Sequence, residues 1–125
     1  MKRRRKYVTS LPYPPSVNHI WKRVGRRTYL TPEAHNYKAN VREIVRARGR
    51  PQPLRGSIAV TIRAYMPDKR KRDIDNLIKI ILDSLTYAGI WGDDNQVDRI
   101  VIERGEVRPY GACLVRVEEM EEEAS

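Results

Sequence analysis

Apolar and polar residues alternate with a period of two between residues 58 and 66. The apolar residues that share one side of this run are Ile58, Val60, Ile62, Ala64 and Met66. Because successive side chains of a strand point to opposite faces, the alternation predicts a strand with one face in the core. Residues 7–11, 99–107 and 112–117 have the β-branched and apolar content of three further strands.

In two other segments, apolar residues recur at the spacing of an α-helix instead of at every second position. The first begins at Thr31, which can cap free N–H groups, continues with Pro32, and ends near Gly49. The second ends at Gly89. The apolar positions are Ala34, Tyr37, Val41, Ile44 and Val45 in the first segment, and Leu77, Ile80, Ile81, Leu85 and Ala88 in the second. We therefore expect a single domain that combines these strands with two main helices.

Residues 20–30, IWKRVGRRTYL, place Gly25 between two runs rich in Val, Tyr, Trp and Thr. This pattern is typical of a β-hairpin or an ordered loop. The segment carries four cations, Lys22, Arg23, Arg26 and Arg27. A solvated hairpin and a basic finger that contacts nucleic acid explain them equally well.

The charge of the chain indicates a polyanionic partner. The 125 residues carry a formal net charge of +9, and five of the sixteen acidic residues lie in the last eight positions. Residues 1–117 therefore hold 25 basic and 11 acidic residues, a net charge of +14. Such an excess costs self-repulsion and is typical of proteins that bind nucleic acid.

Cysteine content and hydropathy argue against a disulfide-stabilised protein and against a membrane-spanning protein. The only cysteine, Cys113, cannot form an internal disulfide, and its apolar neighbours favour a small buried residue. No apolar run approaches the ~20 residues of a membrane span. We therefore expect a soluble cytoplasmic protein, with no membrane partner.

Both ends of the chain are charged. Residues 1–6 contain KRRRK, which we expect to be a solvated basic arm or a phosphate contact. Residues 118–125 contain five glutamates and are expected to be a frayed acidic tail. The folded domain is therefore expected to span residues 7–117.

Residues 69–98 contain most of the candidate functional residues. Four cations at positions 69–72 precede Asp73 and Asp75. Two carboxylates spaced i, i+2 in an extended segment point to the same side and repel each other without a counter-ion. Alternatively, one of them is an N-cap of the second helix. Lys79 follows Asp75 by four residues and precedes Asp83 by four, which fits surface ion pairs or an ammonium placed for catalysis.

A second acidic cluster, GDDNQVD, contains Asp93, Asp94 and Asp98. It could be a turn, because Asp and Asn favour turns, but it lacks the glycine and glutamate positions of an EF-hand. A site with oxygen ligands and no Cys or His cluster suits a hard cation, Mg²⁺ or Mn²⁺.

Residues 72–98, RDIDNLIKIILDSLTYAGIWGDDNQVD, closely resemble the signature of the RusA family of Holliday junction resolvases. Residues 11–21, LPYPPSVNHIW, resemble the amino-terminal motif of that family, and the likeness covers most of residues 7–117. The resemblance implies metal-binding carboxylates at Asp73, Asp75 and Asp94 and an essential lysine at Lys79. The motif spacing favours Asp94 over its neighbour Asp93.

The resemblance also implies an α+β fold, a small mixed β-sheet packed against two main helices in a single domain. It further implies a homodimer that binds a four-way DNA junction and makes two symmetric, Mg²⁺-dependent nicks. In this hypothesis the carboxylates hold one or two metal ions, and Lys79 adds positive charge at the transition state. The cations expected to contact DNA are Lys69, Arg70, Lys71, Arg72, Arg26 and Arg27. Two alternatives stay open: a non-catalytic basic nucleic-acid-binding protein, and a nuclease for other branched DNA.

Overall fold

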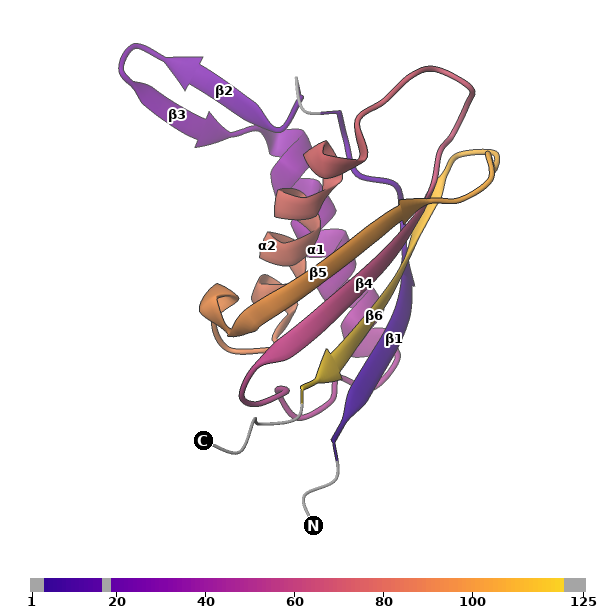
Figure 1. Ribbon diagram of the computed structural model, residues 1–125. Coiled ribbons are helices and arrows are strands. Elements are labelled where there is room, and N and C mark those ends of the chain that lie inside the picture. The colour runs from indigo at the N-terminus through magenta and orange to yellow at the C-terminus, as the bar shows by residue number, and fades with distance from the viewer. Residues whose placement is uncertain (1–3, 17–18, 121–125) are drawn as a thin grey trace.

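A mixed four-stranded sheet forms the centre of the computed structural model, which describes residues 4–16 and 19–120. The strand order is β1-β6-β4-β5 (Figure 1). The outer pair β4 and β5 is parallel, and the other neighbours are antiparallel. The strands are β1 (Lys6–Leu11), β4 (Ile58–Tyr65), β5 (Val97–Arg104) and β6 (Ala112–Glu119). The expected mixed sheet is confirmed, although β5 begins two residues earlier and ends three residues earlier than expected.

Two helices lie together on one face of this sheet, α1 (Pro32–Ala47) and α2 (Ile78–Ala88) (Figure 1). The predicted helix signals are confirmed. The Ala34 N–H donates a 3.2 Å hydrogen bond to Oγ1 of Thr31, and Gly89 ends α2 with a φ of 85°. Because β4 and β5 are parallel, the chain must cross over between them, and α2 lies in that crossover.

The core lies between the sheet and the helices. The predicted inner face of β4 is confirmed, since Ile58, Val60, Ile62 and Ala64 are all buried. Leu85 and Ile90 are fully buried within this single chain. No helix among residues 4–16 and 19–120 is long and apolar enough to cross a membrane.

The basic hairpin predicted around Gly25 is also confirmed. Its strands, β2 (Trp21–Val24) and β3 (Arg27–Leu30), pair only with each other and project from the body of the molecule (Figure 1). Every residue of β2 is exposed. The hairpin contributes little to the core, so its cations and aromatic side chains are free to meet another molecule.

The folded part of the chain is longer at both ends than expected. Lys6 belongs to β1, and β6 runs to Glu119, so a frayed tail from residue 118 is wrong for its first two residues. The Glu119 carboxylate accepts hydrogen bonds from the backbone N–H groups of Arg5 (2.8 Å) and Arg55 (2.7 Å). Residues 1–3 of the expected arm and 121–125 of the expected tail lie outside the described residues.

Cys113 gives a first testable prediction. Its side chain is fully buried, and burial raises the pKa of its thiol from the ordinary 9.0 to about 12. Since the thiolate is the reactive form, we expect the folded protein to react with a thiol reagent about a thousandfold more slowly than an exposed cysteine. The reaction should reach the ordinary rate in denaturant. Equal rates with and without denaturant would contradict the buried position.

Candidate functional site

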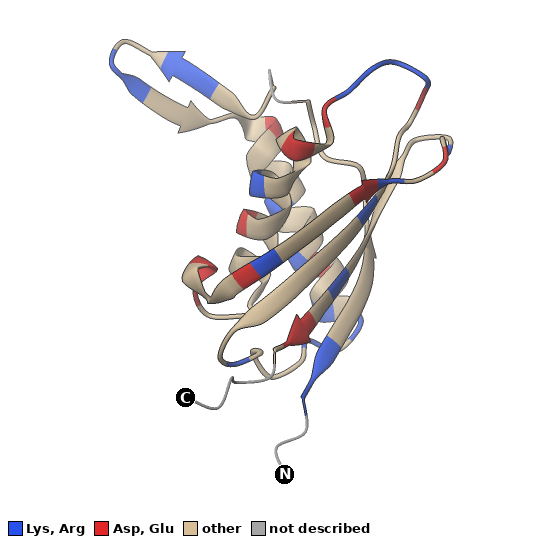
Figure 2. Cartoon of the chain, viewed as in Figure 1, with Lys and Arg blue, Asp and Glu red and all other residues tan. Residues whose placement is uncertain are grey.

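The acidic residues at the start of the second helix lie at one end of the molecule, between two basic surfaces. A short 3₁₀ turn, η2 (Ile74–Leu77), leads directly into α2. On one side of η2 is the β2–β3 hairpin, and on the other is the loop that contains residues 67–73 (Figure 2). Carboxylates in this position are surrounded by the charges that attract a polyanion.

Asp73 occupies the N-cap position of η2, but its side chain makes no capping hydrogen bond. Asp75 lies inside η2 and is exposed. The alternative in which one of these aspartates caps the helix is therefore wrong for the side chains. Neither carboxylate is used to hold the local structure by capping, which leaves both available for a ligand.

The two aspartates line different hollows. The sequence led us to expect both of them in an extended segment, and this is wrong for Asp75, because η2 starts between them. Asp73 lines a hollow beside Tyr13 and Lys71, whereas Asp75 lines a second hollow beside Lys79. Asn76 lines both hollows. The acidic site therefore consists of two neighbouring hollows that share one amide side chain.

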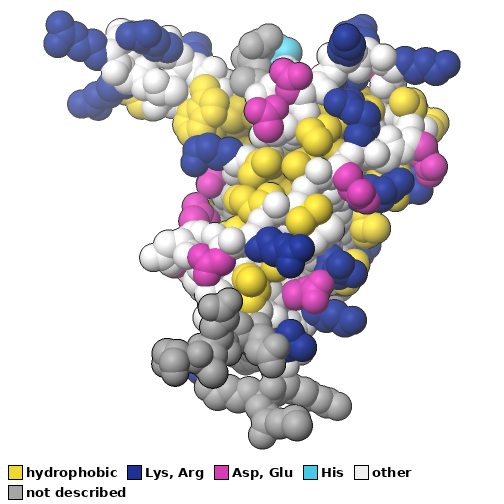
Figure 3. Space-filling model, viewed as in Figure 1, with side chains coloured by type: hydrophobic (Ala, Val, Ile, Leu, Met, Phe, Trp, Pro, Cys, Tyr) yellow, Lys and Arg dark blue, Asp and Glu magenta, His cyan; other side chains and the backbone are white. Residues whose placement is uncertain are grey.

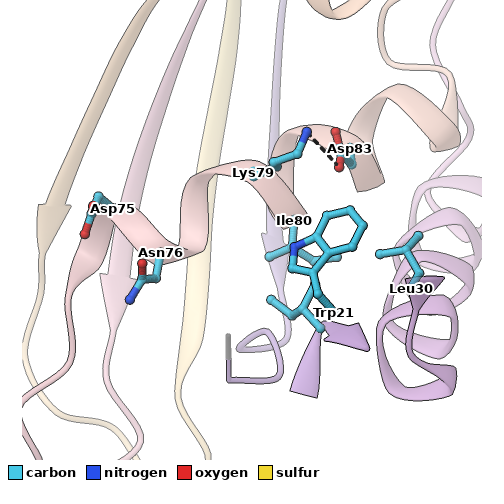
Figure 4. Close-up of a pocket in the computed structure, with 8 residues that line it drawn as sticks. Trp21, Leu30, Asp75, Asn76, Lys79, Ile80 and Asp83 are labelled. Atoms are coloured by element: carbon cyan, nitrogen blue, oxygen red, sulfur yellow. Dashed lines mark ion pairs between the residues drawn. The ribbon is translucent and has the colours of Figure 1, made fainter. Parts of the chain in front are cut away.

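Lys79 lies one helical turn beyond Asp75, in the first turn of α2. Its Nζ lies 3.6 Å from Oδ2 of Asp83, which confirms one of the expected helix-surface ion pairs (Figure 4). The lysine side chain is still 69% exposed, whereas that of Asp83 is 22% exposed. Such an exposed pair holds the ammonium only weakly, so Lys79 can turn toward a bound phosphate.

The second acidic cluster forms another 3₁₀ turn, η3 (Asp94–Gln96). Asp93 caps this turn, since its Oδ1 accepts a 3.0 Å hydrogen bond from the Asn95 N–H, and Gln96 Oε1 accepts one from the Asp93 N–H. Asp94 is exposed and accepts a hydrogen bond from the Thr86 hydroxyl. The turn interpretation is therefore correct for Asp93, and Asp94 is the carboxylate that the turn does not use as a cap.

Asp94 lies far from the other two aspartates within one chain. Its partner Thr86 is eight residues along α2 from Ile78, about 12 Å at 1.5 Å per residue, and Asp75 lies before that helix begins. Oxygen ligands of one Mg²⁺ lie within about 4.2 Å of each other. Among residues 4–16 and 19–120, no three His, Cys, Asp or Glu side chains are close enough to hold an ion together.

The cations of the loop before η2 differ in how firmly other residues hold their side chains. Arg72 is bound to Asp68, through Nη1 and through a 3.1 Å hydrogen bond from Nη2, and its carbonyl accepts a 2.6 Å hydrogen bond from Arg104. Lys69, Arg70 and Lys71 are exposed, although Nε of Arg70 also lies 3.9 Å from Oδ2 of Asp68. Arg72 therefore shapes the loop, while the other three cations of the expected DNA-binding set project into solvent.

Two further members of that set, Arg26 and Arg27, are exposed at the tip of the hairpin. Figure 3 shows basic side chains gathered on the projecting hairpin and on the opposite upper corner of the same face, with acidic side chains between them. The expected nucleic-acid contacts therefore form two groups rather than one continuous surface.

Asp68 gives a prediction about pH. Hydrogen bonds from the Arg72 side chain and the Arg70 N–H lower the pKa of Asp68 from 3.8 to about 2. This contribution to stability is complete above the unfolded value and is lost as the pH falls through about 2. We expect an NMR titration of the Asp68 carboxyl to show a midpoint near 2, with Asp68→Asn identifying the signal. A midpoint near 3.8 would contradict the Arg72 contact.

The fold and the site together define a class of protein: a small basic α+β domain with exposed carboxylates between cationic surfaces, typical of enzymes that cut nucleic acid. The family model described as Endodeoxyribonuclease RusA matches residues 12–118. The chain belongs to the RusA family of endodeoxyribonucleases, which confirms the resemblance found in its motifs.

Curated relatives support this assignment over nearly the whole chain. A protein of Enterobacteria phage HK97 is 36% identical over 115 residues, which cover 92% of this chain and 96% of the relative. Proteins of Enterobacteria phage 82 and Escherichia coli K12 are each 35% identical over 114 residues, covering 91% of this chain and 95% of the relative. All three relatives are named crossover junction endodeoxyribonucleases.

Two residues of the site were not predicted from the sequence. Asn76 contacts both hollows, and Trp21 lines the one that contains Asp75. The only available signal for Asn76 was its position directly after the aspartates. Trp21 lies in the predicted hairpin, and nothing local to it indicates that its side chain shares a hollow with residues of α2.

Proposed function

We propose that this protein is a structure-selective endonuclease that resolves four-way DNA junctions by paired symmetric nicks, in homologous recombination and DNA repair. The observation that carries the proposal is the match of residues 12–118 to a family whose relatives here are named crossover junction endodeoxyribonucleases. Exposed carboxylates between two basic surfaces agree with it. A metal-dependent nuclease needs cationic side chains that attract the DNA backbone and carboxylates that hold the metal beside it.

The proposed metal ligands are Asp73, Asp75 and Asp94, with Mg²⁺ as the ion and Mn²⁺ as a substitute. Their chemistry fits, since all three offer exposed oxygen donors, which hard cations prefer. A bound ion would supply an activated water and stabilise charge on the phosphate. Lys79 would place its ammonium next to the scissile phosphate, and Asn76 can donate a hydrogen bond from its amide.

The proposal includes a homodimer, and the positions of the aspartates give the dimer a catalytic role. Within one chain, Asp94 lies at the far end of α2 from Asp73 and Asp75, so these three carboxylates cannot share one ion. An ion bound by all three would need Asp94 from a second subunit. A symmetric dimer would then contain two such sites, one for each of two equivalent DNA strands.

DNA is proposed to lie across the two basic surfaces. Lys69, Arg70 and Lys71 would contact the backbone on one side of the acidic site, and Arg26 and Arg27 on the other. Arg72 would act mainly by holding the loop, because its side chain is paired with Asp68. Phosphate contacts of this kind position the protein without reading sequence.

Two alternatives remain testable against this proposal. A non-catalytic DNA- or RNA-binding protein would use its aspartates as caps and turns, and the missing cap at Asp73 does not favour it. A nuclease for flaps or other branched DNA would use the same site. Nicking of a labelled four-way junction, a flap and a linear duplex in Mg²⁺ separates all three. The proposed place of action is the cytoplasm of a bacterium or of a phage-infected bacterium.

A further inference from the structure

The hollow beside Asp75 has two chemically different sides. Its volume is about 200 Å³, and it lies between the base of the β2–β3 hairpin and the start of α2 (Figure 4). Asp75, Lys79 and Asp83 supply charged groups, while Trp21, Leu30 and Ile80 supply apolar surface. A nucleotide has the same division, because its phosphate is charged and its base presents two apolar faces.

Trp21, which lines this hollow, is unusual in its exposure to solvent. Its side chain is 41% exposed, whereas the other tryptophan of the chain, Trp91, is 1% exposed and belongs to the core. Trp21 pairs across the hairpin with Leu30, which is only partly exposed and also lines the hollow. The edge of the apolar side is therefore a large indole that the rest of the chain covers only in part.

The hairpin extends this surface toward its tip. Arg23 lies two residues beyond Trp21 on the same strand and therefore on the same face. Tyr29 pairs with Lys22 and lies on the opposite face. One face of the hairpin thus presents the Arg23 cation and the Trp21 indole, and the indole lines the same hollow as Asp75 and Lys79.

We propose that Trp21 is a positioning residue that stacks on the nucleobase next to the scissile phosphate. This inference rests on the proposed function. The phosphate of that nucleotide would meet Lys79 on the charged side of the hollow, while its base would lie against the indole. Stacking on an aromatic side chain is sequence-tolerant, because every base has a π-face.

Stacking on Trp21 also favours a junction over a plain duplex. A base within a continuous duplex must leave its neighbours before it can reach the indole, and this unstacking costs binding energy. At the branch point of an opened junction, a base lacks the neighbour on one side that a continuous duplex supplies, so less stacking has to be broken. Trp21 therefore contributes to selectivity for branched DNA, which cationic side chains alone cannot supply.

The test compares three variants as full-length proteins. Trp21→Leu keeps apolar packing at the hairpin base but removes the stacking surface, and we expect junction cleavage to fall about 5- to 150-fold in kcat/KM. Trp21→Phe keeps an aromatic ring and should recover most of that loss. Tyr29→Leu, at an aromatic residue on the opposite face that is 46% exposed, serves as the matched control and should cleave like the wild type. Circular dichroism and thermal melting check that all three fold.

A spectroscopic measurement separates stacking from a structural role. Trp21 and Trp91 are the only tryptophans, and Trp91 is buried, so quenching of the emission on DNA binding reports Trp21. Without metal, a junction with 2-aminopurine next to the cut should quench wild-type emission, and Trp21→Phe should abolish that change. The base analogue should be quenched by the wild type more than by Trp21→Leu.

Three results would overturn the inference. The first is full cleavage by Trp21→Leu. The second is a 2-aminopurine signal that is identical for wild type and Trp21→Leu. The third is emission from Trp21 that changes with protein concentration alone, which would place the indole between subunits. A wild type that fails to cut the junction at all would contradict the proposed function instead, so the two failures are distinguishable.

Discussion

Replacing Asp75 by asparagine should reduce junction cleavage about a thousandfold or more while leaving the fold intact. A ligand of a catalytic ion helps to supply several kcal/mol of charge stabilisation, and each 1.36 kcal/mol corresponds to a factor of ten in rate. The stability cost should be within about 0.5 kcal/mol, because Asp75 is exposed on the surface. Junction binding should be kept or strengthened, since a carboxylate that repels phosphate has become neutral.

The measurement is single-turnover nicking of a labelled junction, with binding and thermal melting determined for the same protein. Asp98→Asn is the matched control, because Asp98 is an exposed aspartate of the same acidic stretch that lies outside the proposed ligand set. It should cleave at the wild-type rate. Full activity of Asp75→Asn, or an equal loss in both variants, would remove Asp75 from the site.

Mixing two inactive variants should restore activity. We expect Asp75→Asn and Asp94→Asn to be inactive alone, yet a heterodimer of the two would keep one site with both aspartates, provided that Asp94 acts on the partner subunit's site. Random exchange of subunits makes about half of the dimers mixed, each with one intact site, so about a quarter of the wild-type sites should return. These mixed dimers should nick one strand without making the paired cut.

The same experiment has a clear negative result. If each chain held a complete site of its own, each mutation would inactivate the chain that carries it, and mixing would restore nothing. The control mixes Asp75→Asn with Asp73→Asn. Both residues are proposed to act in the same subunit's site, so this mixture has no intact site and should stay inactive. Activity in the control mixture, or none in the test mixture, would contradict the shared site.

Local sequence signals predicted most of the secondary structure. The Thr31–Pro32 start of α1, the alternation of β4 and the glycine end of α2 each depend on residues adjacent in the chain. Contacts between distant segments were harder to predict. Glu119 was assigned to a frayed tail because its partners, Arg5 and Arg55, lie more than sixty positions away.

For the site, too, the sequence identified the residues better than their arrangement in space. The motif identified Asp73, Asp75 and Lys79 as candidate residues, but it could not show that a 3₁₀ turn begins between the two aspartates, which line adjoining hollows. Spacing favoured Asp94 over Asp93, and the capping role of Asp93 agrees with that choice. Trp21 lies more than fifty residues from the α2 residues that line the same hollow, so no local pattern brings them together.

The most direct test of the central proposal is a strand-by-strand map of nicks in a four-way junction, with a flap and a matched linear duplex in parallel. Each strand carries its own label, and Mg²⁺ and Mn²⁺ are both used. We predict paired nicks at symmetric positions in two opposing strands of the junction, with the duplex uncut. Equal cutting of the flap, random cutting of the duplex, or binding without any cleavage in either metal would contradict a junction resolvase.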